Sequence, residues 1–220
     1  MSLTTSQTFS QFLPCDTPDY RMFDTGVETL IMQDFCTAPL IESLRVDDGL
    51  RAFARLPQRE HQLLKQIAQR PDSMVALAYT RQGTIVGQVS LVPADSRWQG
   101  SANMYEVAFE VSSSWRRQGI AQHLLQLVFE LDCLEDLIII GMGLSWHWDI
   151  EGLGLTPFAY RTMIAQLFAQ YRFAEYLTTE GNIRMDPANI FLARIGKRTS
   201  STTQSEFYQR LLQSDTLPGM

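Results

Sequence analysis

Apolar and polar residues alternate along several short segments of the chain, and this two-residue period is typical of β-strands. In the clearest case, Met104–Val111, one face carries Val107, Phe109 and Val111, and the other carries Glu106, Ala108 and Glu110. The run Asp136–Gly141 is instead apolar from Leu137 to Ile140, which predicts a strand buried on both faces. Further strands are predicted at Val27–Met32, Met74–Thr80, Thr84–Val92, Phe173–Thr178 and Ile190–Ile195.

Other segments repeat their apolar residues every three or four positions, which is the period of a helix packed on one face. These predicted helices cover Pro39–Phe53, Leu56–Gln69, a segment from Ile120 to about Asp132, Pro157–Gln170 and Glu206–Gln213. The turn Arg81-Gln82-Gly83 joins two strands into an antiparallel hairpin. The order of the elements predicts a mixed α/β sheet in a single domain.

The ends of the chain differ from its middle. Residues 1–20 are rich in Ser, Thr, Gln and Pro and predict a loose leader; residues 213–220 are expected to form a tail, leaving 21–212 as the domain. The net charge of −6 and the scattered Lys and Arg argue against nucleic-acid binding, and only Gly196-Lys197-Arg198 is locally basic. No apolar run reaches the roughly 20 residues that a membrane span needs.

Three cysteines, Cys15, Cys36 and Cys133, have no metal-ligand spacing, and any single disulfide would leave one of them unpaired. We therefore expect no metal site. A reducing cytoplasm fits this cysteine usage best.

The segment with recognisable chemistry follows the strand Met104–Val111. Its residues Arg116-Arg117-Gln118-Gly119-Ile120-Ala121 open a predicted helix. The first amides of a helix lack intrahelical acceptors, and the helix dipole adds positive charge there. Gly119 and Ala121 allow close approach to the backbone, and Arg116 and Arg117 can add charge-assisted bonds to phosphate oxygens. The loop therefore predicts a site for a phosphate-bearing ligand.

From Glu106 to Leu125 the sequence resembles motif A of the GNAT superfamily of N-acetyltransferases. The resemblance implies a twisted, mostly antiparallel mixed sheet flanked by helices, and acetyl-CoA as co-substrate. It also implies that the loop amides of Arg116, Arg117, Gln118, Gly119, Ile120 and Ala121 hold the CoA pyrophosphate, and that Phe109, Glu110 and Val111 bond the pantetheine arm. Two positions depart from the commoner pattern, because Ala121 replaces a glycine and Arg117 stands where glycine is frequent.

A closer resemblance covers roughly residues 55–212. Trp146-His147-Trp148-Asp149 and Ala193–Arg198, together with Tyr160-Arg161, look like segments of the AcuA family of acetoin-utilisation acetyltransferases. The resemblance implies transfer of an acetyl group to a lysine of a protein partner, acetyl-CoA synthetase.

Direct transfer to an amine needs a base for the ammonium proton and an acid for the departing thiolate. Glu106 is the favoured base, with a solvated strand face as the alternative interpretation. His147 could be the base or bind substrate, or be a packed side chain; Asp149 could orient it. Tyr160 is the expected acid, the position where superfamily members commonly carry such a tyrosine, and otherwise a half-buried core residue.

Two other functions remain open on the sequence alone. One is acetylation of a small-molecule amine, and the other is a non-catalytic acyl-CoA-sensing module. Both would keep the CoA loop, so the acceptor side must discriminate between them.

Overall fold

The computed structural model describes residues 19–213, apart from 54–55, 99–100 and 102. Nine strands of the described chain form one sheet in the order β1-β2-β4-β5-β6-β7-β9-β8, with β3 paired to β5. Their bounds are β1 Tyr20–Asp24, β2 Thr29–Gln33, β3 Arg45–Val46, β4 Met74–Thr80, β5 Thr84–Pro93, β6 Met104–Val111, β7 Ile138–Gly143, β8 Ala174–Glu175 and β9 Ile190–Ile195. All neighbours pair antiparallel except β3 with β5 and β6 with β7.

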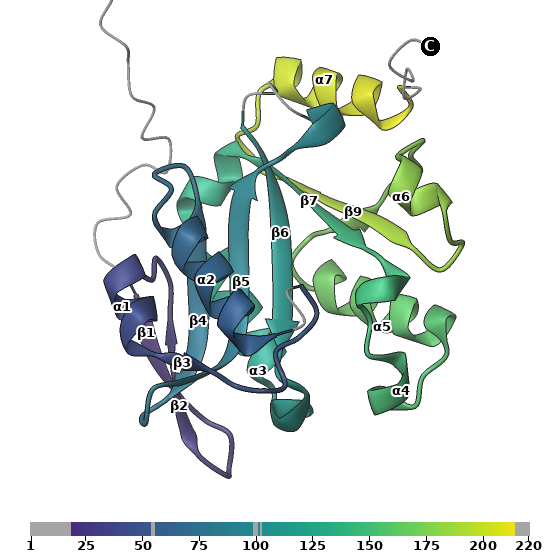
Figure 1. Ribbon diagram of the computed structural model, residues 1–220. Coiled ribbons are helices and arrows are strands. Elements are labelled where there is room, and N and C mark those ends of the chain that lie inside the picture. The colour runs from purple at the N-terminus through teal and green to yellow at the C-terminus, as the bar shows by residue number, and fades with distance from the viewer. Residues whose placement is uncertain (1–18, 54–55, 99–100, 102, 214–220) are drawn as a thin grey trace, which may run out of the picture.

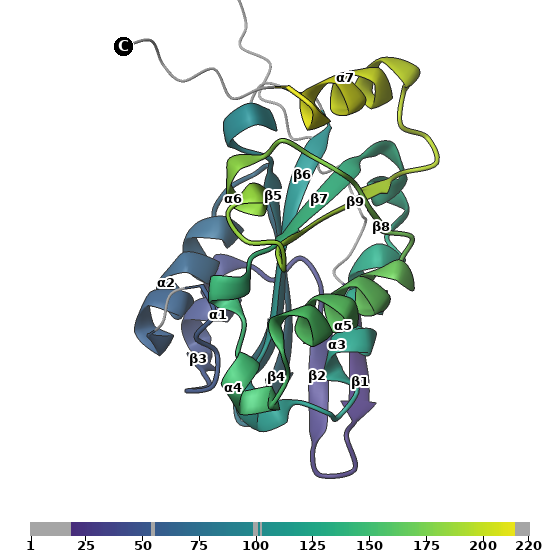
Figure 2. The same cartoon turned by 90° about the vertical axis from the view of Figure 1, so that its right-hand side faces the viewer.

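Helices cover both faces of this sheet (Figures 1 and 2). They are α1 Ala38–Ser43, α2 Pro57–Ala68, α3 Ile120–Phe129, α4 Ile150–Leu153, α5 Pro157–Ala169, α6 Gly181–Arg184 and α7 Ser201–Leu211. Figure 2 shows α1 and α2 on one side of the sheet and α3 and α5 on the other. The predicted fold class, a mostly antiparallel mixed sheet flanked by helices, is confirmed.

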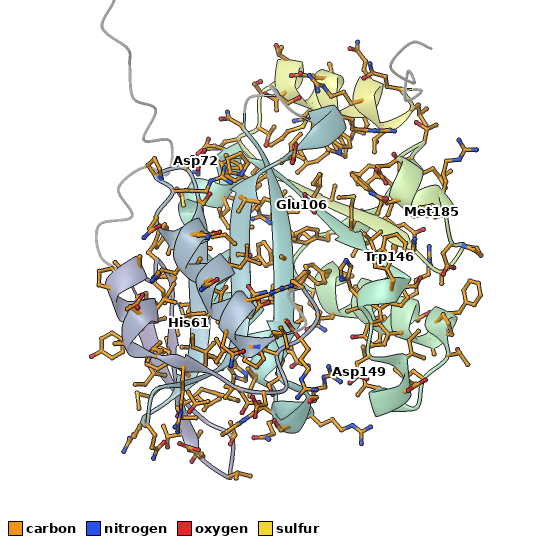
Figure 3. All side chains as sticks on the ribbon, in the orientation of Figure 1. His61, Asp72, Glu106, Trp146, Asp149 and Met185 are labelled. Carbon is orange, nitrogen blue, oxygen red and sulfur yellow. The ribbon has the colours of Figure 1, made fainter. Side chains whose placement is uncertain are left out.

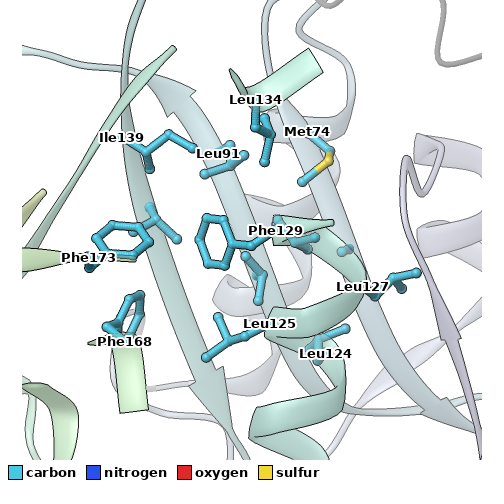
Figure 4. Packing of buried hydrophobic residues seen from close by; sticks show 14 of the residues in the cluster. Met74, Leu91, Leu124, Leu125, Leu127, Phe129, Leu134, Ile139, Phe168 and Phe173 are labelled. Carbon is cyan, nitrogen blue, oxygen red and sulfur yellow. The ribbon is translucent and has the colours of Figure 1, made fainter. Parts of the chain in front are cut away.

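The largest part of the core lies between the sheet and the pair α3 and α5 (Figure 4). Leu124 and Leu125 of α3 are fully buried there, and Phe168 of α5 packs edge-on against Phe173. The buried residues Ile120, Leu124, Leu127 and Val128 of α3 recur with the spacing of an amphipathic helix, and burying each large apolar side chain contributes about 1.5–3 kcal/mol. This packing fixes the start of α3 beneath the end of β6.

The sheet divides between its two central parallel strands. The register of β6 and β7 runs only from Met104 opposite Ile138 to Glu106 opposite Ile140. Beyond Glu106 the strands diverge, as Figure 1 shows, while β5 continues to pair with β6 as far as Val111. One backbone edge of β6 therefore faces the opening rather than a neighbouring strand.

The helix predicted over Pro39–Phe53 is wrong beyond Ser43. Asp47 turns the chain by accepting a hydrogen bond from the amide of Gly49 (2.9 Å), as turn-forming aspartates do. The hydroxyl of Ser112 also donates to the Asp47 carboxylate (2.5 Å). Residues 45–46 instead form β3, and residues 47–53 form a loop that reaches the end of β6.

Most of the remaining predicted elements are present with shifted ends. Helix α7 begins at Ser201 rather than at the predicted Glu206, and only Ala174–Glu175 of the strand predicted over Phe173–Thr178 forms a strand. The bounds of β4, β6 and β9 coincide with the prediction, and β7 begins two residues later than expected. Strand β1 was missed; its first residue, Tyr20, falls inside the predicted leader. The rest of that leader, to residue 18, and residues 214–220 of the predicted tail lie outside the described residues. Within the described chain, each helix is too short or too polar to cross a membrane.

The locally basic segment is part of the scaffold. Arg198 donates to Asp136 (2.8 Å) and Asp132 (2.9 Å), and the amide of Lys197 donates to Glu135 (2.8 Å). These bonds fasten the end of β9 to the turn before β7.

Candidate active site

A cavity of about 730 Å³ opens where β6 and β7 separate. Its walls come from the second half of β6, the start of α3, the end of β7 with the segment that follows, and α5. Figure 3 places Glu106 in the middle of the sheet and Trp146 and Asp149 in the segment after β7. Every predicted site residue except Gln118 lines this cavity.

The predicted phosphate loop has the backbone of an anion site. Gly119, with φ +78°, precedes α3. The first helical hydrogen bond runs from the amide of His123 to the carbonyl of Gly119, so the amides of residues 120–122 have no carbonyl of their own helix to bind. Arg117 also has a positive φ of 63°. A left-handed conformation costs a non-glycine residue about 1–2 kcal/mol. This cost explains why glycine is frequent at the position that Arg117 occupies in this chain.

The side chain of Arg116 lines the cavity but already has an anionic partner. Its guanidinium donates to Asp149 (2.5 Å), and Asp149 also accepts from the amide of Gly152 (2.9 Å), capping α4. The hydrogen bond from Arg116 holds the pKa of Asp149 below its ordinary value. Asp149 thus joins the loop to the segment after β7 rather than orienting His147.

Glu110 has a contact that the sequence did not predict. Its side chain is 6% exposed, and one carboxylate oxygen accepts from the amides of Arg51 (2.7 Å) and Ala52 (2.9 Å). Burial raises the pKa of this carboxyl group. The prediction gave Glu110 only a backbone role. Its partners were missed because residues 51–52 fall within the helix wrongly predicted over 39–53.

Glu106 is half-buried at the point where β6 and β7 part. Burial raises the pKa of its carboxyl group, and the nearby charges of Asp95 and Glu180 raise it further. A raised pKa brings a carboxylate closer to the range in which a general base works at neutral pH. The negative charges around it also favour a cationic substrate group.

His147 is exposed beside the same cavity. Its Nδ1 lies 2.8 Å from the carbonyl oxygen of Ala52. Because a carbonyl can only accept, Nδ1 carries the proton, and Nε2 of the neutral ring keeps its lone pair. The imidazole lies 5.7 Å from the ring of Phe53 and 6.1 Å from that of Trp146, between centroids.

Tyr160 lies in the first turn of α5, which begins at a Thr156 cap followed by Pro157. Its ring stacks on Trp148 with centroids 4.9 Å apart and planes 10° from parallel. Burial raises the pKa of its phenol, so the hydroxyl stays protonated at neutral pH and is able to donate. The structure thus brings Glu106, His147 and Tyr160 to one cavity.

Comparisons with known proteins agree with this geometry. The model of the acetyltransferase (GNAT) family matches residues 39–131. The acetoin utilization protein AcuA of Bacillus licheniformis is 33% identical over 165 residues, covering 73% of this chain and 78% of the relative. The chain belongs to the AcuA family of GNAT acetyltransferases.

Other AcuA relatives extend the likeness. The acetoin utilization protein AcuA of Bacillus subtilis is 31% identical, covering 72% of this chain and 77% of its own. The crystal structure of an acetoin utilization protein from Exiguobacterium sibiricum superposes with a TM-score of 0.85 at 26% identity, covering 89% of this chain and 94% of that one. The GNAT domain of S. lividans PAT, at 13% identity and a TM-score of 0.50 (80% of this chain and 95% of that one), shares the fold.

As a member of the AcuA family, the protein is an N-acetyltransferase, and its co-substrate is acetyl-CoA. The residues present fit this co-substrate. A helix N-terminus with left-handed residues 117 and 119 offers amides to a pyrophosphate, and the edge of β6 beyond Glu106, which has no strand partner on the β7 side, lines the cavity.

Proposed function

We propose that this acetyltransferase modifies the ε-amino group of a lysine in a partner protein, by direct transfer within a ternary complex. The observation that carries the proposal is the carboxylate of Glu106. It is half-buried in the cavity, and the charges of Asp95 and Glu180 lie close enough to raise its pKa. An anionic site of this kind complements an alkylammonium group. The resemblance to AcuA acetyltransferases nominates acetyl-CoA synthetase as the partner.

The residues of the chain supply the proton transfers. Glu106 takes a proton from the acceptor ammonium, freeing the nitrogen lone pair. Acetyl-CoA supplies the acetyl group as a thioester, whose C–S bond breaks as the new C–N bond forms. Tyr160 gives its hydroxyl proton to the departing thiolate, and the raised pKa of the phenol keeps that proton in place until then. The second proton that the nitrogen loses on becoming an amide returns the phenol of Tyr160 to its protonated form.

The loop and strand hold the co-substrate in this proposal. The amides at the start of α3 bind its phosphates, with Arg116, Arg117 and Gln118 around them. The backbone of Phe109, Glu110 and Val111 bonds the arm. His147 stands on the acceptor side, and it becomes the base instead of Glu106 if the Glu106→Gln variant keeps full activity while His147→Ala loses it.

The free, buried thiol of Cys36 is in keeping with a reducing compartment, so we place the protein in the cytoplasm.

The decisive experiment incubates the purified protein with labelled acetyl-CoA and purified acetyl-CoA synthetase. Label on one synthetase lysine, with loss of synthetase activity, is the expected result. Label only on small amines would make this a small-molecule acetyltransferase, and binding of acetyl-CoA without any transfer would make it a sensing module.

A further inference from the structure

Three hydrogen bonds connect Glu110 to His147 through the backbone of Arg51 and Ala52. The Glu110 carboxylate accepts from the amides of Arg51 and Ala52, and the carbonyl of Ala52 accepts from Nδ1 of His147 (2.7, 2.9 and 2.8 Å). The loop of residues 47–53 is therefore held between a strand of the sheet and the segment after β7.

The strand end of this connection is buried in the sheet. Glu110 lies on β6, paired with Gln88 of β5, and its side chain is 6% exposed. Its second carboxylate oxygen is buried and has no hydrogen-bond partner among the described residues. Among the described residues, the carboxylate of Glu110 therefore accepts hydrogen bonds from the two loop amides alone. A carboxylate binds amide N–H groups more strongly than a neutral acceptor does.

The histidine end of this connection lines two hollows. Ala52, Glu110 and His147 line the main cavity and also a second hollow of about 640 Å³ between the loop and the segment after β7. With Nδ1 committed to the Ala52 carbonyl, Nε2 of neutral His147 is the ring nitrogen left with a lone pair. Exposure of the ring makes that nitrogen reachable for an incoming amine.

We propose that Glu110 acts through the backbone of Arg51 and Ala52 as a positioning residue for His147, holding Nε2 where it accepts a hydrogen bond from the acceptor amine. The inference rests on the proposed amine acetylation and deepens it. It gives the Glu110 side chain a task separate from the backbone role of β6 toward acetyl-CoA. Its substrate class is a primary alkylamine, which as an ammonium ion donates up to three hydrogen bonds.

The test combines a spectroscopic and a kinetic measurement. Long-range ¹H–¹⁵N spectra of protein labelled at histidine report which ring nitrogen carries the proton, with His147 assigned by comparison with the His147→Asn variant. The wild type should show the Nδ1–H tautomer at His147. Glu110→Ala should shift it toward the Nε2–H form, and Glu110→Gln, which keeps an acceptor oxygen for the amides, should restore it.

In the kinetic arm, Glu110→Ala should raise the KM for the acceptor roughly tenfold, the effect of one hydrogen bond to a charged group, while the KM for acetyl-CoA stays unchanged. His147→Asn keeps a donor to the Ala52 carbonyl but has no counterpart of Nε2, so it should raise acceptor KM similarly in a protein that folds. This variant decides the question if Glu110→Ala does not fold.

An unchanged tautomer in Glu110→Ala, or wild-type acceptor kinetics in His147→Asn, overturns the inference. The spectra are recorded without acceptor, so they test the connection even if the synthetase proves not to be the partner. Absence of transfer by the wild type would instead count against the proposed function.

Discussion

At the scale of single residues, Glu106 and His147 differ in how the fold prepares them. Glu106 stands on a strand whose alternation is plain in the sequence, so its face and its place at the cavity could be predicted. The hydrogen bond of His147 could not, because it depends on a loop whose turn chemistry, Asp47-Asp48-Gly49, lies inside an apparently helical pattern. Local side-chain bonds to the backbone outweighed that pattern.

Glu106→Gln should lower the turnover number roughly 100-fold, the lower range for loss of a general base. The base must be deprotonated, so the wild-type rate should fall as pH drops through the pKa of Glu106, which burial raises above its ordinary 4.5. The glutamine variant should lose that limb of the profile. Rates measured across pH at saturating acetyl-CoA check this.

Glu42→Gln is the matched control, because Glu42 lies on α1 and pairs with Lys65 away from the cavity. It should behave like the wild type. A glutamine at position 106 with full activity would remove Glu106 from the mechanism.

Among the elements, α3 joins the core to the co-substrate loop. Its buried leucines were predictable from their spacing, and its start was predictable from the strand–loop–helix order. The salt bridge from Arg116 to Asp149 could not be predicted, because the two residues are 33 positions apart and neither the apolar spacing nor the order of elements indicates that they pair.

Gly119→Glu should abolish acetyl-CoA binding in a protein that still folds, since it puts bulk and negative charge at the start of α3. Gly26→Glu is the matched control: Gly26 has a similar φ of +81°, and a Cβ there meets nothing within 4 Å. Both substitutions place a side chain at a positive φ, and at position 119 the new Cβ also lies 3.3 Å from the ring of Phe23. Calorimetric titration with acetyl-CoA should show binding for Gly26→Glu alone; binding by both would show that the loop is not the phosphate site.

A second element-scale prediction concerns the buried Arg194 of β9. It is 1% exposed and donates to Glu135 (2.6 Å). Removing Glu135 leaves the buried guanidinium of Arg194 with the carbonyl of Leu134 but no anionic partner, and it also removes the bonds that Glu135 accepts from Arg172 and from the amide of Lys197. Glu135→Ala should therefore lower the free energy of unfolding by about 3 kcal/mol.

Glu175→Ala removes the partner of Arg161, a more exposed pair, and should cost less than about 1 kcal/mol. Urea denaturation of both variants makes the comparison. Equal losses of unfolding free energy in the two variants would mean that the buried pair of Arg194 and Glu135 stabilises the protein no more than the exposed pair does.

At the scale of the whole molecule, the sheet and its two helical layers could be predicted from the order of the long elements. The short strands and helices could not. Strands β3 and β8 have two residues each, and helices α4 and α6 have four, too few for any period to be visible. They exist because of local hydrogen bonds: β3 pairs with β5, β8 pairs with β9, and the side chains of Asp149 and Glu180 cap α4 and α6.

Cys36 provides a probe of global opening. Burial between α1, α2 and the sheet raises the pKa of its thiol to about 12. In a Cys15→Ser, Cys133→Ser background, Cys36 should therefore resist alkylation at neutral pH and react at the rate at which the chain unfolds. Fast labelling under native conditions would show that this layer opens locally.

The split between β6 and β7 affects how well the protein resists aggregation when no acetyl-CoA is bound. An uncovered strand edge is a template on which another chain can add, and thus a route to aggregation. A ligand bound only by the folded state adds about 2.7 kcal/mol of stability at a hundredfold excess over its Kd. The concentration of acetyl-CoA should accordingly affect how long the folded protein persists as well as how fast it turns over. When acetyl-CoA is scarce, more of the enzyme should be lost to unfolding and aggregation.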